Sequence, residues 1–222
     1  MTFSIAAKCR HTGMIGTGVT TKNLAVGARC PFVRAGAGAV LTQQVTDMRL
    51  GPRGLDLLSE GKTADEVIEA LVAGNETVGW RQLAAVDGDG NTAFYSGDSV
   101  PTIRAGHQGD GCVAIGNGIR NSDVPKAMVE GYERYPDAHL AERLLSGLEA
   151  GMAAGGQFGQ ITAASLHVVD THVFPIVDLR VDYDPLVLAK MRFLWEAFEP
   201  KIDYFIELAI NPDTPTNPYY VA

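Results

Sequence analysis

The sequence predicts an α+β protein, a four-layer αββα sandwich in which two antiparallel sheets lie between layers of helices. Strands with period-two alternation are joined by short glycine-containing connections, which is typical of antiparallel hairpins. Pairs of helical segments separate the groups of strands, so helices are expected to cover the outer faces of the sheets. The 222 residues contain no linker, repeat or low-complexity segment. We therefore expect one domain over residues 1–222, with an extended tail at 213–222.

The first hairpin is the clearest element. From Thr2 to Cys9, alternate residues separate into two faces, and Met14 to Thr21 alternates again after the turn at His11-Thr12-Gly13. Two such runs across a short turn indicate paired antiparallel strands. Further strands are expected over 28–34 and 38–44.

Helices follow these strands. Gly51-Pro52-Arg53-Gly54 precedes a leucine-rich helical stretch, and Thr63-Ala64-Asp65-Glu66 has the form of a capping box that starts a second helix. The remaining elements follow in chain order: strands over 80–86, 92–96 and 111–116, helices over 123–135 and 138–154, strands over 161–169 and 171–181, and helices over 185–198 and from Pro200 to Ile210.

Composition excludes several classes of function. The net charge is −8 and the chain has no basic run, which argues against nucleic acid or an anionic membrane as a partner. No apolar run approaches the roughly 20 residues of a membrane span. The first residues lack the pattern of a signal peptide, so we expect a cytoplasmic protein. Cys9, Cys30 and Cys112 show no CxxC spacing, and we expect them to be buried and reduced.

Motifs for phosphates, dinucleotides and metals are absent. The five histidines are scattered, so a metal-dependent enzyme is the weakest of three function classes, and we expect neither metal nor cofactor. Asp87, Asp89 and Asn91 alternate with glycine, but a calcium loop would need a glutamate at its twelfth position. A hairpin turn explains this segment better.

Thr2 is the candidate nucleophile. Methionine before a small residue is commonly removed, and removal of Met1 would leave a free α-amine on a threonine that begins a strand. Threonine with its own amine combines nucleophile and base, because the amine can accept the hydroxyl proton. With Met1 in place this chemistry is not possible, and Thr2 is then simply a second residue.

The surroundings of Thr2 strengthen this interpretation. Residues 2–7, the turn at Thr12-Gly13 and residues 16–22 resemble the start of proteasome-type subunits. More closely, the chain resembles an uncharacterised bacterial family, a domain of unknown function classed with the N-terminal-nucleophile (Ntn) hydrolase-like proteins. The segments that carry this second resemblance are 2–5, 25–29, 34–40, 42–43, 51–55, 116–117 and the run from 140–145 through 155–156.

The resemblance implies an Ntn-type sandwich and a set of site residues. Thr2 would be the nucleophile, and Lys22 would favour its deprotonated form or a developing oxyanion; a solvated lysine at a hairpin end is the alternative. Asn117 could offer its amide to an oxyanion or a substrate, against the alternative of a turn asparagine. Gln43 is a further candidate, whose amide would face a pocket. No acidic residue orients the lysine, which leaves this catalytic set incomplete.

The expected function is hydrolysis of an amide bond, or acyl transfer, on a small molecule or peptide. The alternative is a non-catalytic ligand-binding or assembly protein that keeps the fold. We also expect a homodimer or larger homo-oligomer, with the aromatic tail at Pro215–Tyr220 near an interface. Fold alone does not decide between these functions.

Overall fold

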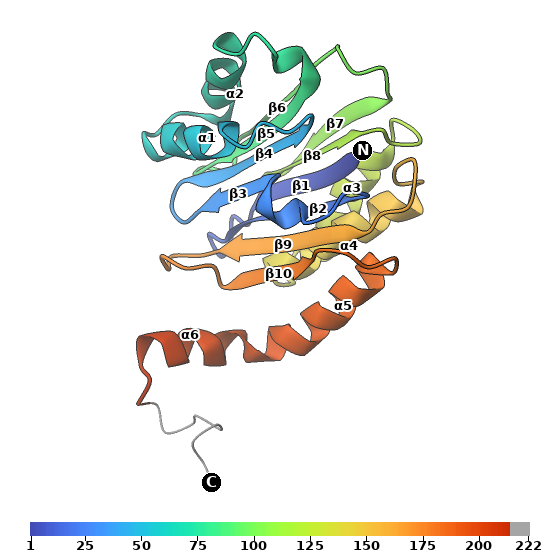
Figure 1. The fold of residues 1–222 in the computed structure, drawn as a ribbon. Helices are drawn as coiled ribbons and strands as arrows, with labels where there is room; N and C mark the ends of the chain where they lie inside the picture. The colour runs from blue at the N-terminus through green and yellow to red at the C-terminus, as the bar shows by residue number, and fades with distance from the viewer. Residues whose placement is uncertain (214–222) are drawn as a thin grey trace.

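The computed structural model describes residues 1–213 (Figure 1). Its strands are β1 (Thr2–Lys8), β2 (Ile15–Thr21), β3 (Pro31–Arg34), β4 (Gly38–Gln44), β5 (Arg81–Asp87), β6 (Thr92–Ser96), β7 (Arg104–Gly109), β8 (Cys112–Asn117), β9 (Ala163–Val169) and β10 (Val177–Val181). Its α-helices are α1 (Leu50–Ser59), α2 (Ala64–Ala73), α3 (Val124–Glu133), α4 (Leu140–Ala153), α5 (Val187–Phe198) and α6 (Ile202–Ile210).

The strands form two sheets. One has six strands in the order β10-β9-β2-β1-β8-β7, and the other has four in the order β3-β4-β5-β6. Every neighbouring pair within both sheets is antiparallel. The expectation of an α+β protein with antiparallel sheets is therefore confirmed.

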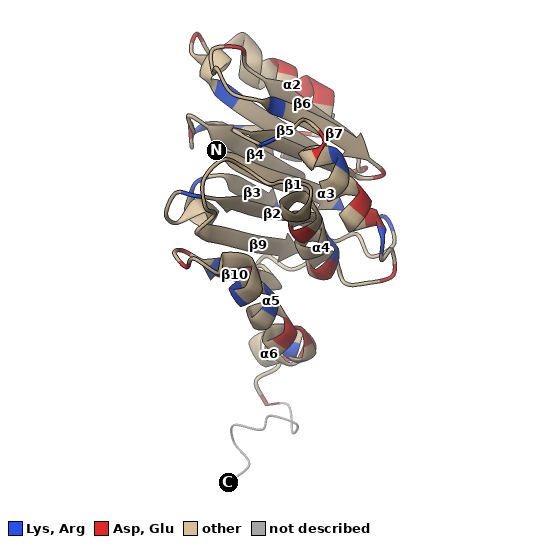
Figure 2. Ribbon diagram, turned by 90° about the vertical axis from the view of Figure 1, so that its right-hand side faces the viewer, with Lys and Arg blue, Asp and Glu red and all other residues tan. Residues whose placement is uncertain are grey.

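The three largest hydrophobic clusters among the described residues lie against the faces of the sheets. One joins residues of both sheets, among them Ala6 and Ile115 from the larger sheet and Leu41 and Val86 from the smaller. A second lies between α1, α2 and the smaller sheet, and the largest lies between the six-stranded sheet and α3, α4 and α5. Figure 2 shows charged residues concentrated on helices and loops, while the strands are largely uncharged.

β1 runs through the middle of the larger sheet and is buried on both faces. Phe3, Ile5 and Ala7 belong to the cluster under α3 and α4, whereas Ser4 and Ala6 face the smaller sheet. β2 is equally buried, and a Cβ added at Gly16 would lie 3.0 Å from Leu144 Cδ1 and 2.8 Å from the His167 carbonyl oxygen. Glycine at this position lets α4 approach the sheet closely.

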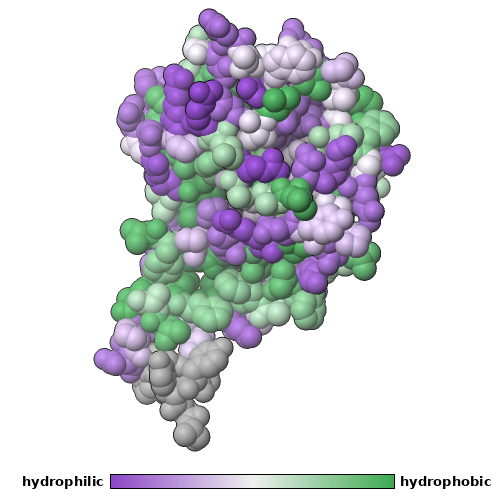
Figure 3. All heavy atoms as spheres, viewed as in Figure 1, coloured by the Kyte–Doolittle hydropathy of each residue, from purple (hydrophilic) through white to green (hydrophobic). Residues whose placement is uncertain are grey.

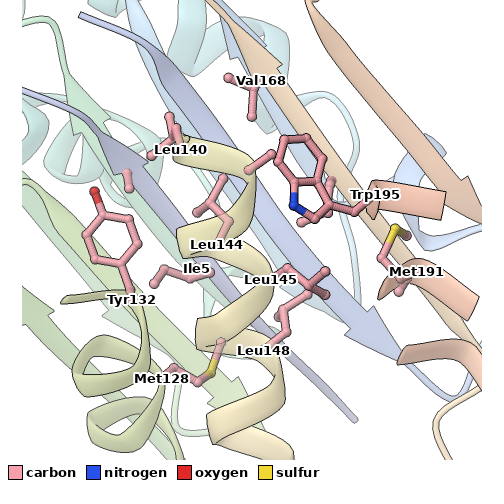
Figure 4. Packing of buried hydrophobic residues seen from close by; sticks show 14 of the residues in the cluster. Ile5, Met128, Tyr132, Leu140, Leu144, Leu145, Leu148, Val168, Met191 and Trp195 are labelled. Carbon is pink, nitrogen blue, oxygen red and sulfur yellow. The ribbon is translucent and has the colours of Figure 1, made fainter. Parts of the chain in front are cut away.

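The helices follow the local signals in the sequence. Thr63 Oγ1 accepts the backbone N–H of Glu66 at 3.3 Å, and the Glu66 carboxylate accepts the N–H of Thr63 at 2.9 Å. This is the expected capping box at the start of α2. In α4, Leu144 and Leu148 point into the large core, where Trp195 of α5 is also buried (Figure 4).

Some elements differ from the sequence expectation. β7 was not expected, because its sequence RAGHQG has neither β-branched nor aromatic residues; it forms by pairing along β8. Residues 26–28 form a 3-10 turn, so the strand expected from 28 begins at Pro31. The strand expected over 171–181 is limited to β10. The tail expected over 213–222 lies outside the described residues from 214 onward.

α5 and α6 form a C-terminal arm, joined by a 3-10 turn at Glu199–Lys201, that extends beyond the six-stranded sheet (Figure 1). Apolar surface gathers over this part of the molecule (Figure 3). Its exposed side chains include Phe193 of α5 and Ile210 of α6. Across residues 1–213, no helix has both the length and the apolar character needed to cross a membrane.

Candidate active site

The candidate residues come together at one end of the space between the sheets. Thr2 begins β1, and its register partners are Thr21 at the end of β2 and Asn117 at the end of β8. Gln43 lies near the end of β4 in the facing sheet, and Lys22 directly follows β2. The four candidates from the sequence, Thr2, Lys22, Gln43 and Asn117, therefore lie at adjacent strand ends.

The Thr2 side chain is only 5% exposed and faces the smaller sheet, like Ser4 and Ala6. Its hydroxyl donates to Thr21 Oγ1 at 3.1 Å, and Thr21 Oγ1 in turn donates to the Met1 carbonyl oxygen at 2.6 Å. The two hydroxyls thus form a chain that ends on the peptide bond between Met1 and Thr2. While this bond is intact, the nitrogen of Thr2 is an amide and cannot act as a base.

A buried amide network connects the two sheets beside Thr2. Ser4 Oγ donates to Gln43 Oε1 at 2.7 Å, and Gln43 Nε2 donates to Gln82 Oε1 at 2.7 Å. Gln82 Oε1 also accepts Asn117 Nδ2 at 3.1 Å. Gln82 Nε2 lies 3.0 Å from the Gly116 carbonyl oxygen and 3.0 Å from Ser96 Oγ. Buried polar groups that are paired in this way fix strand ends relative to one another.

The network defines what Gln43 and Asn117 are able to offer. Both amide atoms of Gln43 are engaged within the protein, and Nε2 also lies 3.5 Å from the Thr2 carbonyl oxygen. Asn117 Nδ2 carries two hydrogens and makes one hydrogen bond among the described residues. Asn117 therefore has a second N–H to offer, whereas Gln43 positions its neighbours.

The electrostatics of this strand end favour a neutral amine. Burial lowers the pKa of the Met1 α-amine below its ordinary value, and the nearby charge of Lys22 lowers it further, while Cys30 acts in the opposite direction. The Lys22 side chain is exposed, and its carbonyl oxygen accepts the Thr162 hydroxyl at 2.9 Å.

Met1 occupies the space in front of these groups. A Cβ added at Gly118 would lie 2.2 Å from Met1 Cγ, so the Met1 side chain lies directly over Gly118. Gly118 has a left-handed φ of 60° and follows Asn117 at the end of β8. Loss of Met1 would vacate the space beside Asn117 and Gly118.

Sequence reasoning missed Thr21 and Gln82. Thr21 shares a strand face with Thr17 and Val19, so its direction could be read from period two, but its pairing with Thr2 depends on the hairpin register. Gln82 lies in an expected strand, yet its contact with Asn117 joins residues of different sheets. No local signal reports such a contact.

Other parts of the molecule show less convergent chemistry. No group of three histidine, cysteine, aspartate or glutamate side chains suited to a metal ion occurs within residues 1–213. A cavity of about 640 Å³ lies between α3, α4 and α5, and on its wall Arg192 forms ion pairs with both Glu142 and Glu149. A second cavity, of about 520 Å³, is lined by Arg49 and Arg53 near the start of α1.

Comparisons with known proteins place the chain in a family. The crystal structure of a Silicibacter pomeroyi protein described with the DUF1028 family is similar, with a TM-score of 0.82, 28% identity and 88% of each chain covered. Anbu, an ancestral β-subunit from Yersinia bercovieri, aligns with a TM-score of 0.42 and 10% identity over 93% of this chain and 97% of its own. No curated protein matches. The model of a family of unknown function, DUF1028, matches residues 2–191, and the chain belongs to that family.

Proposed function

We propose that this protein is an N-terminal-nucleophile amidohydrolase or acyl transferase, built as a four-layer αββα sandwich of the Ntn type. It would act on a small amide or peptide after removal of Met1. One observation carries the proposal: the Thr2 hydroxyl is buried at a strand end and hydrogen-bonded to Thr21 Oγ1, which itself holds the Met1 carbonyl oxygen. Removal of Met1 places an α-amine and a hydroxyl on the same residue at this point.

The chemistry follows from the freed groups. The Thr2 amine accepts the hydroxyl proton as Thr2 Oγ1 attacks the substrate carbonyl carbon. Collapse of the tetrahedral intermediate breaks the C–N bond, and the proton passes from the amine to the leaving nitrogen. An ester on Thr2 remains. Water releases it as a carboxylic acid, or another nucleophile accepts the acyl group.

The surroundings support the amine as a base. Burial and the charge of Lys22 lower the pKa of the amine at this chain end while Met1 is present. The new amine of Thr2 lies one residue further into the strand. Its strand partner is Thr21, which Lys22 directly follows, so Lys22 remains close. The pKa of the Thr2 amine is therefore expected below the ordinary 7.7–8.0 or so. A larger fraction is then neutral at pH 7, as a general base requires.

Thr21 and Asn117 support the proposal in different ways. Once Met1 is lost, the Thr21 hydroxyl has no carbonyl acceptor and is free to orient the amine or hydroxyl of Thr2. The second N–H of Asn117 can donate to the oxyanion that forms at the substrate carbonyl. Met1 removal would vacate the space beside Gly118, and the substrate acyl group would enter there.

The test begins with the intact mass of protein made in its native host, which reports whether Met1 is removed. Processed protein is then treated with an acylating β-lactone probe, and the modified peptide is identified by mass spectrometry. Thr2→Val should abolish labelling and Thr2→Ser should retain it. Thr20→Val is the matched control, because its hydroxyl donates to the Ala163 carbonyl oxygen instead. Retention of Met1 in the native protein would end the Thr2 mechanism.

A second candidate is a non-catalytic ligand-binding or assembly protein that retains the fold. The observation that favours it is the fit of Met1, whose carbonyl oxygen accepts Thr21 and whose side chain covers Gly118. Assembly as a homo-oligomer belongs to either proposal, and the apolar surface of α5 and α6 supports it. Light scattering that gives a 23.7 kDa monomer at micromolar concentration would contradict assembly.

A further inference from the structure

The connection between α4 and β9 forms one side of the Thr2 site. This rim loop, residues 155–160, is attached to the end of β8 by two backbone hydrogen bonds: Phe158 N–H donates to the Gly118 carbonyl oxygen at 2.8 Å, and Arg120 N–H donates to that of Gly156 at 3.0 Å. Ile119 and Gln157 form an isolated antiparallel bridge between them. Figure 1 shows the loop beside the N-terminus. The rim loop therefore lies against residues 118–120, which follow Asn117 and include Gly118, the residue in contact with the Met1 side chain.

Two cationic side chains flank the rim loop. Lys22 Cδ lies 3.7 Å from the position of a Cβ on Gly159, and the Arg120 guanidinium lies 5.5 Å from the centroid of the Phe158 ring. Both cations are exposed, and neither side chain has an ion pair or hydrogen bond among residues 1–213. Arginines that do pair with a carboxylate include Arg10, Arg34, Arg49, Arg180 and Arg192.

These charges stand out on an acidic protein. The chain carries a net charge of −8, yet Lys22 and Arg120, on either flank of the rim loop, form no ion pair among the described residues. Fixed positive charges at the rim of a site attract anions and raise their local concentration. The Phe158 ring, 46% exposed, is held against Arg120 and gives the guanidinium a defined position.

The rim loop also contains an unpaired buried amide. Gln157 is 2% exposed, and neither its Oε1 nor its Nε2 has a hydrogen-bond partner among the described residues. An unpaired buried polar group is unfavourable, so its retention calls for a reason beyond packing. A polar ligand that enters beside the rim loop when Met1 is removed could supply the missing partners.

We propose that Arg120, Phe158 and Lys22 form a subsite for the carboxylate of an anionic amide substrate, such as an N-acyl amino acid or a short peptide with a free C-terminus. This proposal rests on the proposed function, because the amide bond must reach Thr2 while the carboxylate is held at the rim. The planar guanidinium of Arg120 donates two parallel hydrogen bonds to the carboxylate. Lys22, which lies beside Gly159 of the rim loop, contributes the second positive charge.

The experiment compares an N-acetyl amino acid with its carboxamide, which is equal in shape and neutral. Processed wild-type protein should show a higher kcat/KM for the carboxylate, and Arg120→Met should reduce that preference at least about tenfold. Arg134→Met is the matched control, because Arg134 is exposed, has no ion pair among the described residues and lies at the end of α3. This control should keep the wild-type preference.

A binding measurement separates this proposal from the proposed function. Thr2→Ala protein, shown by intact mass to lack Met1, is titrated by calorimetry with the N-acetyl amino acid, with its carboxamide and with inorganic phosphate. Binding of the carboxylate that is lost in Thr2→Ala/Arg120→Met supports the subsite even where the wild type hydrolyses nothing. Hydrolysis without preference for the carboxylate overturns the subsite and leaves the nucleophile in place. Phosphate binding as tight as that of the carboxylate also overturns it, because the site is then a general anion site.

Discussion

Replacement of Gln82 by leucine tests whether the amide network holds the two sheets together at the Thr2 end. Gln82 is 0% exposed, and its side chain joins Gln43 of the smaller sheet to Asn117 and Gly116 of the larger. Leucine fills a similar volume but neither donates nor accepts a hydrogen bond. The substitution therefore isolates the polar contribution from the packing contribution.

The expected cost is the sum of the groups left unpaired. Gln82→Leu removes the acceptor of Gln43 Nε2, the acceptor of Asn117 Nδ2 and a donor to the Gly116 carbonyl oxygen. Each buried group without a partner costs about 1–3 kcal/mol, and leucine recovers part of this through apolar burial, so we expect a loss of about 3–6 kcal/mol in the free energy of unfolding. With a urea m-value of about 2 kcal/mol per M, the midpoint falls by roughly 1.5–3 M.

Gln157 provides a matched control within the same protein. It is the same residue type and is 2% exposed, but its amide atoms have no partner among the described residues. Gln157→Leu removes no hydrogen bond and should leave the unfolding free energy within about 0.5 kcal/mol of wild type or raise it. Urea unfolding followed by tryptophan fluorescence and by circular dichroism measures both variants. Equal losses in the two variants would refute the reasoning, because the pairing of Gln82 would then carry no stability.

Three further predictions concern titration and backbone geometry. In processed protein, the rate of Thr2 labelling should rise with pH through an amine pKa below the ordinary 8 or so. Lys22→Met should move this rise to higher pH, because it removes the positive charge that disfavours the protonated amine, while Lys201→Met should not. An unchanged pH dependence in Lys22→Met would rule out this coupling. Burial would raise the pKa of Asp87, but hydrogen bonds from Asn91, Ala64 and Asp89 outweigh it and lower the pKa. Asp87 therefore contributes stability above its unfolded pKa of about 3.9, and this contribution is lost as pH falls through the folded pKa. Asp87→Asn should therefore be less stable than wild type at pH 7 and approach it at pH 2–3 or so in urea titrations, whereas a constant difference would contradict the assignment. Gly118→Ala should destabilise protein that retains Met1 more than processed protein, because the new Cβ would lie 2.2 Å from Met1 Cγ. Thermal unfolding of the two forms measures the difference. Equal losses in the two forms would mean that Met1 moves aside freely.

Much of the candidate site could be anticipated from sequence because its parts are local. Thr2 begins the first alternating run, and the first hairpin is indicated by period two and a glycine turn, so Thr2 and Lys22 could be expected at the same end of that hairpin. For Asn117, the sequence predicted only that it follows the strand expected over 111–116, and not which residues it contacts. Gly155-Gly156 predicted the end of the preceding helix, but the sequence did not indicate that the rim loop contacts Gly118.

The sequence by itself determined the elements whose signals are short in range. The capping box at Thr63 and the leucine face of α4 depend on residues three and four apart, and the structure contains both. β7 was missed because an edge strand without β-branched residues is stabilised by its partner β8 and not by its own composition.

Only the tertiary structure decided which groups meet around Thr2. Thr21 reaches Thr2 through hairpin register, and Gln82 reaches Asn117 across the space between the sheets. Arg120 and Phe158 meet because the connection from α4 to β9 returns along the end of β8. Contacts of this kind depend on how whole sheets face each other. The free energy that selects this arrangement comes from apolar burial shared by many residues. No single segment of the chain therefore encodes these contacts.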